Sequence, residues 1–277
     1  MDAVTRTRTL PEAGSWTVRW NHVPSPRLRL LCLPHAGGGA AVYRAWPRHM
    51  PPDVEVVAIR LPGRESRFRE PALTRVGHVV GALVQEIAPL LDRPHVWFGH
   101  SMGALLAFEA CRELRRRGLG EPARLMVSGR PAPDIPSRRP PIHDAPLPDL
   151  LTRLRELGGT PPEFLEDPDV MSPLLPALRA DFAVVETYRY RPGPPLDCPI
   201  SVFGGAADLE ATLDELRAWR THTSVRCIVR TFEGGHFYLH DTPQEVLPEI
   251  GRDLPVPWPV NEAGAVPAND ERSGRNP

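Results

Sequence analysis

The chain has 277 residues, which is long enough to bury the core of one large domain. Its 33 basic and 34 acidic side chains give a formal net charge of −1, so it has no charge excess suited to nucleic acid or an anionic membrane. Residues 1–16 lack the apolar core of a secretory signal, and no apolar run approaches the ~18 residues of a membrane span. The four cysteines stand singly, with spacing typical of neither zinc sites nor disulfide frameworks, so we expect buried thiols in a cytoplasmic protein.

Short apolar, β-branched runs alternate with helical stretches along most of the chain. Near-continuous apolar strands between helices are typical of a mostly parallel sheet with helices on both faces. We therefore predict an α/β fold. The predicted strands are residues 16–20, 28–33, 54–59, 95–98, 124–128, 200–203 and 225–231.

The middle of the chain departs from this alternation. Residues 131–148 are rich in proline, leucines then recur at helical spacing over 147–157, and a second amphipathic segment covers 172–188. Because ligands bind at the carboxyl edge of open α/β sheets, we predict that these helices form a lid there, with ordinary packing helices as the alternative. The predicted organisation is a core of residues 1–136 and 191–254, a helical lid of residues 137–190 and a disordered tail of residues 255–277.

The most informative motif is Gly99-His100-Ser101-Met102-Gly103, which stands between a predicted strand and a helical run. In this context a G-x-S-x-G sequence forms a nucleophile elbow, a tight turn that holds the serine in an unfavourable backbone conformation. Both glycines are required because a Cβ atom would collide with the neighbouring strand or helix. We therefore predict Ser101 as a nucleophile at the carboxyl edge of the sheet.

A serine nucleophile needs a histidine as its base, and the histidine needs a carboxylate. Asp208 follows the strand at 200–203 and His236 follows the strand at 225–231, each in a glycine-containing loop at the same sheet edge as Ser101. Their order along the chain is the Ser, Asp, His order of α/β-hydrolases. Glu210, two residues after Asp208 in the same loop, is the alternative acid.

The oxyanion of a tetrahedral intermediate needs two preorganised donors. We predict the N–H of Met102, which follows the nucleophile, and the N–H of Ala36 in the loop His35-Ala36-Gly37-Gly38-Gly39. Phosphate binding is the alternative role of this loop, but the loop has neither the lysine of a P-loop nor the spacing of a dinucleotide fold. His35 and His100 are expected to pack or to hydrogen-bond beside the site.

Six segments, including the elbow and the start of the glycine loop, match the pattern of one family: 33–38 (LPHAGG), 61–65 (LPGRE), 99–104 (GHSMGA), 157–161 (LGGTP), 178–182 (LRADF) and 234–237 (GGHF). Over about residues 28–248 the chain resembles the type II thioesterases that accompany polyketide and nonribosomal peptide synthases. The resemblance implies an α/β-hydrolase fold with a helical lid. It also implies a triad of Ser101, Asp208 and His236, with Ala36 and Met102 as oxyanion donors.

The resemblance implies an activity as well. A type II thioesterase hydrolyses aberrant or stalled acyl groups from the phosphopantetheine arm of acyl or peptidyl carrier proteins through an acyl-serine intermediate. The implied partners are the carrier domains of a synthase and the acyl thioester, with no nucleic acid and no membrane. No cofactor and no metal are expected, since the substrate itself carries the phosphopantetheine. The alternatives are a carboxylester hydrolase acting on small oxoesters and, less favoured, an acyltransferase or cyclase or a non-catalytic binding protein with the hydrolase fold.

Carrier proteins are usually acidic, so arginines near the predicted site are candidates for docking. A solvated surface without a docking role is the alternative, and no arginine is assigned to the site. The candidates are Arg60, Arg64, Arg67, Arg138 and Arg139.

Overall fold

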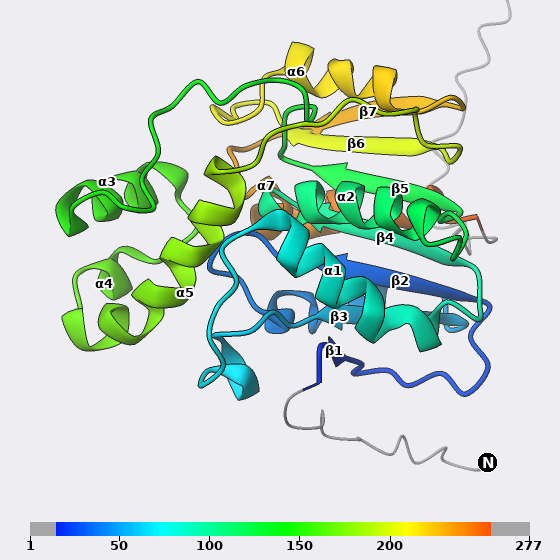
Figure 1. The fold of residues 1–277 in the computed structure, drawn as a ribbon, viewed down its shortest axis with the longest axis horizontal. Coiled ribbons are helices and arrows are strands. Elements are labelled where there is room, and N and C mark those ends of the chain that lie inside the picture. The colour runs from blue at the N-terminus through cyan, green and yellow to red at the C-terminus, as the bar shows by residue number, and fades with distance from the viewer. Residues whose placement is uncertain (1–14, 256–277) are drawn as a thin grey trace, which may run out of the picture.

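The computed structural model describes residues 15–255, which form a seven-stranded sheet between helices (Figure 1). The strand order is β1-β3-β2-β4-β5-β6-β7, and all neighbours pair in parallel except β1, which is antiparallel to β3. The predicted mostly parallel sheet is therefore confirmed. The strands are β1 (Thr17–Val18), β2 (Leu28–Leu33), β3 (Val54–Ile59), β4 (His95–His100), β5 (Arg124–Ser128), β6 (Ile200–Gly205) and β7 (Cys227–Phe232).

The apolar runs of the sequence become strands that are buried on both faces, and every residue of β2, β3, β4 and β6 is buried. β4 and β6 extend two residues beyond their predicted ends, because backbone pairing continues past the last apolar side chain to His100 and Gly205. β7 begins at Cys227 rather than at residue 225. At the sheet edge, only Thr17–Val18 of the predicted 16–20 pairs with β3.

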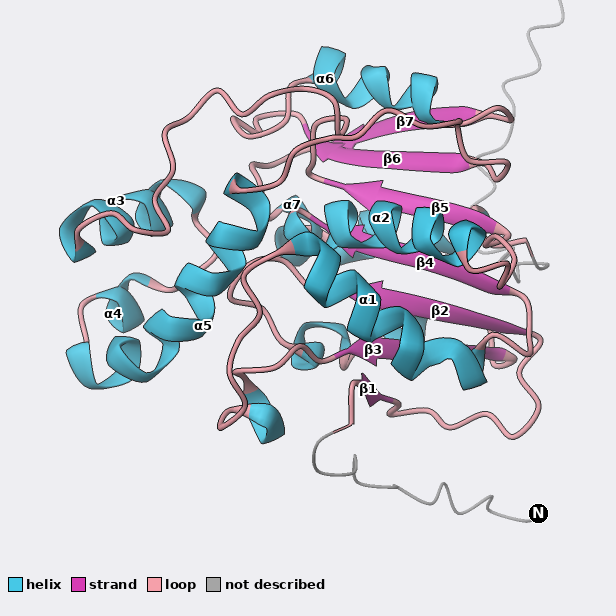
Figure 2. Cartoon of the chain, viewed as in Figure 1, coloured by secondary structure: helices cyan, strands magenta, loops and turns pink. Residues whose placement is uncertain are grey.

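Helices cover both faces of the sheet with their apolar sides, and Figure 2 shows α1 (Val76–Ile87) and α2 (Met102–Arg116) against one face. The same core cluster includes Leu216 of α6 (Leu213–Arg217). The opposite face packs against α8 (Pro243–Arg252) through Val246 and Ile250. The remaining short elements outside the middle of the chain are η1 (Ala40–Tyr43), η2 (Trp46–His49), η3 (Glu65–Arg67), η4 (Ala88–Leu90), η5 (Ala218–His222) and α7 (Tyr238–Asp241).

Three helices between β5 and β6 lie beyond the carboxyl ends of the strands, at the left of Figure 1, and we name them the cap helices: α3 (Leu147–Leu157), α4 (Pro162–Leu165) and α5 (Pro168–Glu186). Their buried side chains form an apolar cluster of their own. α3 has the predicted bounds and ends at Gly158 in the left-handed conformation. α5 begins earlier than the predicted residue 172, because the Asp167 side chain caps it by accepting the N–H groups of Asp169 and Val170.

The boundaries of the core and the lid and the disorder of the tail remain predictions. The boundaries between a core of residues 1–136 and 191–254 and a lid of residues 137–190 are sequence-based divisions. Of the tail predicted at 255–277, all but Pro255 lies outside the described residues. Among the helices of residues 15–255, none combines the length and the apolar composition needed to cross a membrane.

Candidate active site

The turn after β4 has the geometry of a nucleophile elbow. Ser101 has φ of 54° and ψ of −113°, a conformation that residues other than glycine rarely adopt. A Cβ atom on Gly99 would lie 2.1 Å from the carbonyl oxygen of Gly103, and a Cβ atom on Gly103 would lie 2.1 Å from the carbonyl oxygen of Leu33. Because no side chain fits at these distances, only glycine lets the strand, turn and helix pack this closely.

The structure brings Ser101, Asp208 and His236 together at the carboxyl edge of the sheet. The distance from His236 Nε2 to Ser101 Oγ is 3.0 Å, and the distance from His236 Nδ1 to Asp208 Oδ2 is 2.9 Å. Asp208 and His236 are both buried. In this arrangement the imidazole can accept the serine proton while the carboxylate fixes its tautomer and stabilises the imidazolium that forms.

The loops that hold the acid and the base are joined to each other. The Ala207 N–H donates to the Gly234 carbonyl at 2.9 Å, beside the pairing of β6 with β7. A Cβ atom on Gly205 would lie 2.2 Å from the carbonyl oxygen of Gly235. The glycines of both loops therefore permit a close approach that fixes Asp208 and His236 relative to each other.

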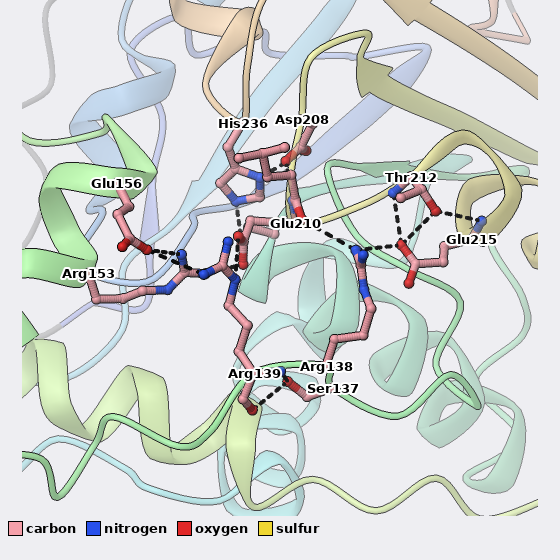
Figure 3. A network of polar contacts seen from close by, with 12 residues as sticks. Ser137, Arg138, Arg139, Arg153, Glu156, Asp208, Glu210, Thr212, Glu215 and His236 are labelled. Carbon is pink, nitrogen blue, oxygen red and sulfur yellow. Dashed lines mark hydrogen bonds and ion pairs between the residues drawn. The ribbon is translucent and has the colours of Figure 1, made fainter.

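Asp208 and Glu210 have different partners, although they share a loop. The Glu210 N–H donates to Asp208 Oδ1 at 2.8 Å, which leaves Oδ2 for His236. The Glu210 carboxylate instead forms ion pairs with Arg139, at 3.3 Å, and with Arg153 of α3 (Figure 3). The geometry therefore favours Asp208 over Glu210 as the acid, and it gives Glu210 a contact with the cap helices.

Both predicted oxyanion donors have a free N–H group. Within residues 15–255, neither Ala36 nor Met102 donates a backbone hydrogen bond. Met102 is the first residue of α2, where a helix has unsatisfied N–H groups and a partial positive charge. Ala36 lines the same cavity as Ser101, in the turn that the Gly38 N–H closes by donating to the His35 carbonyl at 3.0 Å.

Three further histidines lie beside the site. The ring centroid of His100 is 5.0 Å from that of His236, and the ring centroid of His35 is 5.9 Å from that of His100 and 5.6 Å from that of His240. Burial lowers the pKa of His35 to about 3 and holds the pKa of His100 well below its ordinary value, and partial burial lowers the pKa of His240. His100 Nδ1 lies 2.8 Å from Ser128 Oγ, and Ser128 Oγ lies 2.6 Å from Tyr238 Oη. His35 thus packs against neighbouring rings and His100 hydrogen-bonds to Ser128, which are the two alternatives that the sequence predicts for these residues, and among residues 15–255 only His236 forms a histidine hydrogen bond with Ser101.

A cavity of about 1000 Å³ opens above Ser101 and His236. The cap helices supply apolar side chains to its wall, including Leu178 and Phe182 of α5. Its size is at the upper end of the range for small-molecule sites. The cavity therefore has room for an acyl chain beside the nucleophile.

The arginines considered for docking fall into two groups. Arg60, Arg64 and Arg67 are buried, so they are neither docking residues nor solvated surface as the sequence suggested. Their guanidinium groups instead bond inward, as when Arg67 donates to the Arg60 carbonyl at 3.0 Å. Arg138 and Arg139 line the cavity, where they form ion pairs with Glu215 and with Glu156 and Glu210 (Figure 3).

Sequence reasoning assigned no role to Asp181, which is buried on α5 and contacts the oxyanion loop. The signal was present in the sequence. Asp181 shares the side of the helix that faces the protein with Leu178, Phe182 and Val185. A carboxylate on the apolar stripe of a helix indicates a buried partner, because an unpaired charge is costly to bury.

Residues 28–254 match the family model described as a thioesterase domain. The chain belongs to the thioesterase family. A sequence relative of this thioesterase is the gramicidin S biosynthesis protein GrsT of Aneurinibacillus migulanus, which is 41% identical over 245 residues covering 88% of this chain and 96% of GrsT.

Two solved structures are also similar to this thioesterase. The type II thioesterase BorB from the borrelidin biosynthetic cluster has a TM-score of 0.80 at 36% identity, covering 88% of this chain and 99% of BorB. RedJ, a thioesterase from the prodiginine pathway of Streptomyces coelicolor, has a TM-score of 0.79 at 36% identity, covering 83% and 87%. Together with the sheet topology, these likenesses confirm the predicted α/β-hydrolase fold.

Proposed function

We propose that this thioesterase is a type II, editing enzyme that hydrolyses aberrant or stalled acyl groups from the phosphopantetheine arm of carrier proteins in polyketide or nonribosomal peptide synthesis. The single observation that supports hydrolysis most directly is the alignment of Ser101, His236 and Asp208 at 3.0 and 2.9 Å. The class of substrate is supported by similarity to GrsT, BorB and RedJ, whose names place them in gramicidin S, borrelidin and prodiginine biosynthesis.

The proposed reaction has two steps. Ser101 Oγ attacks the thioester carbonyl while His236 Nε2 accepts its proton, and the N–H groups of Ala36 and Met102 hold the oxyanion. The carbon–sulfur bond then breaks, His236 returns the proton to the leaving thiol, and an acyl-serine remains. A water molecule next attacks the acyl-serine with His236 again as the base, which releases the acid and regenerates the serine.

No cofactor or metal is needed in this scheme, since the side chains supply the nucleophile, the base and the acid. The carrier protein would deliver its acyl group through the phosphopantetheine arm, so an acyl or peptidyl carrier domain is the proposed partner. The four cysteines are free thiols rather than disulfides, which supports the proposed location in the reducing cytoplasm.

We also propose that the segment of residues 137–190 acts as a lid. The support is the placement of the cap helices at the carboxyl edge of the sheet, with Leu178 and Phe182 in the cavity wall. A lid of this kind would exclude water from the acyl chain during acylation. Shielding by packed helices would still leave the pocket weakly selective, because one methylene group in an apolar pocket contributes only ~1–3 kcal/mol of discrimination.

The test compares the hydrolysis of propionyl-carrier protein with that of ethyl propionate, with Ser101→Ala as the inactive control. We expect a higher kcat/KM on the carrier-bound thioester, and a loss of at least ~10³-fold in Ser101→Ala with an unchanged melting temperature. Preference for the simple ester would instead indicate a carboxylester hydrolase. Near-normal turnover in Ser101→Ala would exclude the serine mechanism.

A further inference from the structure

A carboxylate from the cap helices reaches the loop that carries the Ala36 N–H. Asp181 of α5 is only 2% exposed, and its Oδ2 accepts the Gly37 N–H at 2.8 Å. Gly37 is the residue directly after Ala36, so this bond fixes the backbone next to the proposed oxyanion donor. The two partners are 144 positions apart in the sequence, and the contact therefore joins the cap helices to the core.

Arg64 completes this contact from the other side. Its Nη1 and Nη2 atoms donate to Asp181 Oδ2 at 2.8 Å and to Asp181 Oδ1 at 2.7 Å, in a two-pronged ion pair. The same Nη1 donates to the Gly38 carbonyl at 2.8 Å. Arg64 is 8% exposed. The loop is thus held at Gly37 by the carboxylate and at Gly38 by the guanidinium.

The loop needs this support because its sequence is flexible. It contains three consecutive glycines, and Gly37 has a positive φ of 78°. α5 also packs directly on it, since a Cβ atom on Gly37 would lie 2.9 Å from Leu178 Cδ1. Glu65, the neighbour of Arg64, adds a third anchor by accepting the Ala41 N–H at 2.9 Å.

We propose that Asp181 and Arg64 are positioning residues that hold the oxyanion loop in its catalytic geometry, so that the oxyanion hole is complete only when α5 is seated on the core. Packing of the cap helices on the core would then be required for stabilisation of the transition state. The inference rests on the proposed serine mechanism but not on the identity of the acyl donor, because thioesters and oxoesters use the same oxyanion hole.

The chemistry of the pair explains why its loss would affect the loop. A buried carboxylate with three hydrogen bonds is satisfied, whereas removal of that carboxylate leaves the buried Arg64 charge without a counter-charge and the Gly37 N–H without an acceptor. Both groups then turn toward water, and the loop moves with them. A displacement of about 1 Å at a catalytic group is sufficient to reduce turnover by on the order of 10²-fold.

The test measures Asp181→Asn and Asp181→Ala with a carrier-bound thioester and with p-nitrophenyl propionate. We expect kcat to fall by about 10- to 100-fold on both substrates, with KM changed less than threefold. The affinity for an alkylboronic acid, whose tetrahedral adduct with Ser101 places an oxygen in the oxyanion hole, should fall in parallel. Hydrogen exchange at the Gly37 amide should be faster in Asp181→Ala.

A matched control is the Arg230–Asp253 pair, which is also two-pronged, with bonds of 2.6 and 2.9 Å, and which joins β7 to the end of α8. Neither residue lines the cavity. Asp253→Asn should lower the melting temperature and leave kcat and boronate affinity within twofold of the original protein.

Several results would overturn the proposal. An unchanged kcat in Asp181→Asn, or a higher KM with unchanged kcat and boronate affinity, would show that Asp181 does not position the oxyanion loop for catalysis. If the Asp181 variants do not fold, Arg64→Lys provides the same test, because a lysine keeps the charge but cannot bond to both carboxylate oxygens. A wild-type protein that hydrolyses only the oxoester would contradict the proposed substrate and leave this test intact.

Discussion

Asp208 and Glu210 show how two identical charges two residues apart acquire different roles. Asp208 Oδ2 contacts His236 at 2.9 Å, and its other oxygen accepts the Glu210 N–H at 2.8 Å. The Glu210 carboxylate turns away toward Arg139 and Arg153. A hydrogen bond to the backbone and one to the imidazole leave Asp208 no freedom to rotate, which is the requirement for fixing a tautomer.

We therefore predict that Asp208→Asn lowers kcat by on the order of 10³- to 10⁴-fold, because an amide at this position favours the wrong imidazole tautomer. Glu210→Gln should lower kcat by less than about tenfold, since its carboxylate bonds to Arg139 and Arg153 and not to His236, so that the substitution removes only these two ion pairs. Steady-state kinetics on a propionyl thioester measure both effects. The reverse ranking would assign the acid to Glu210.

At the scale of single elements, the elbow between β4 and α2 depends on backbone atoms rather than on side chains. Gly103 lies where the helix crosses the carbonyl groups of Leu33 and Pro34, and a Cβ atom there would lie 2.1 Å from the first and 2.8 Å from the second. Backbone atoms cannot move aside as a flexible side chain can. The helix start, with the Met102 N–H, would have to shift.

We predict that Gly103→Ala lowers the free energy of unfolding by about 3 kcal/mol or more and abolishes turnover. The matched control is Gly81→Ala in the interior of α1, where the nearest group to an added Cβ atom is an arginine nitrogen at 3.9 Å. That substitution should raise stability by about 0.5–1 kcal/mol, because alanine favours the helix. Urea unfolding measures both changes, and equal effects would contradict the steric account.

The sequence predicts the elements that a local pattern fixes, and it does not predict the contacts that join distant parts of the chain. β2, β3 and β5 have their predicted bounds, because their apolar runs are fixed by burial on both faces. The four-residue helix α4 was not predicted, since it is too short to show a helical period. For the active site, the elbow and the glycine loops predict Ser101, Asp208 and His236, and the structure brings these three residues together.

Other parts of the site depend on contacts that no local pattern encodes. The pairing of Asp181 with Arg64 spans 117 positions of the chain, so the segment at 61–65 gave no sign that its arginine is buried. The same holds for Arg60, which donates to the Ser15 carbonyl 45 positions away. Arg67 is different, because its partners lie nearby in the sequence: it donates to the Arg60 carbonyl and to the Glu70 carboxylate. Both guanidinium groups can be buried because carbonyl or carboxylate oxygens accept their hydrogen bonds.

At the scale of the whole molecule, two apolar clusters hold the helices to the sheet and a third holds the cap helices to each other. The contacts from the cap helices and the segment before them to the core include several ion pairs, those of Asp181 with Arg64, Arg153 with Glu210 and Arg138 with Glu215. An ion pair with an exposed partner, such as Arg138 with Glu215, contributes little to stability and is screened by salt. The buried Asp181–Arg64 pair is therefore the polar contact best placed to fix the cap helices on the core.

His95, at the opposite end of the sheet from Ser101, couples the stability of the whole molecule to pH. His95 opens β4, is 6% exposed, and its Nδ1 accepts the Trp97 Nε1–H at 3.1 Å, which requires a neutral ring. Burial, with a smaller effect from the Arg29 charge, lowers the pKa of His95 from 6.5 to about 4. Between these values the unfolded chain binds a proton that the folded chain excludes, so the free energy of unfolding rises with pH across this window and is constant above it.

We predict that this one group makes the protein about 2 kcal/mol less stable at pH 5 than at pH 7, since each unit of pKa difference corresponds to about 1.4 kcal/mol. His95→Gln keeps an acceptor for Trp97 and cannot titrate, so its loss of stability between pH 7 and pH 5 should be smaller by that amount. Urea unfolding at pH 5, 6, 7 and 8 measures the profile, with His49→Gln as a control at an exposed position. Parallel profiles for the original protein and His95→Gln would show that protonation of other groups, such as His35 and His100, accounts for the acid sensitivity, because burial also lowers their pKa values.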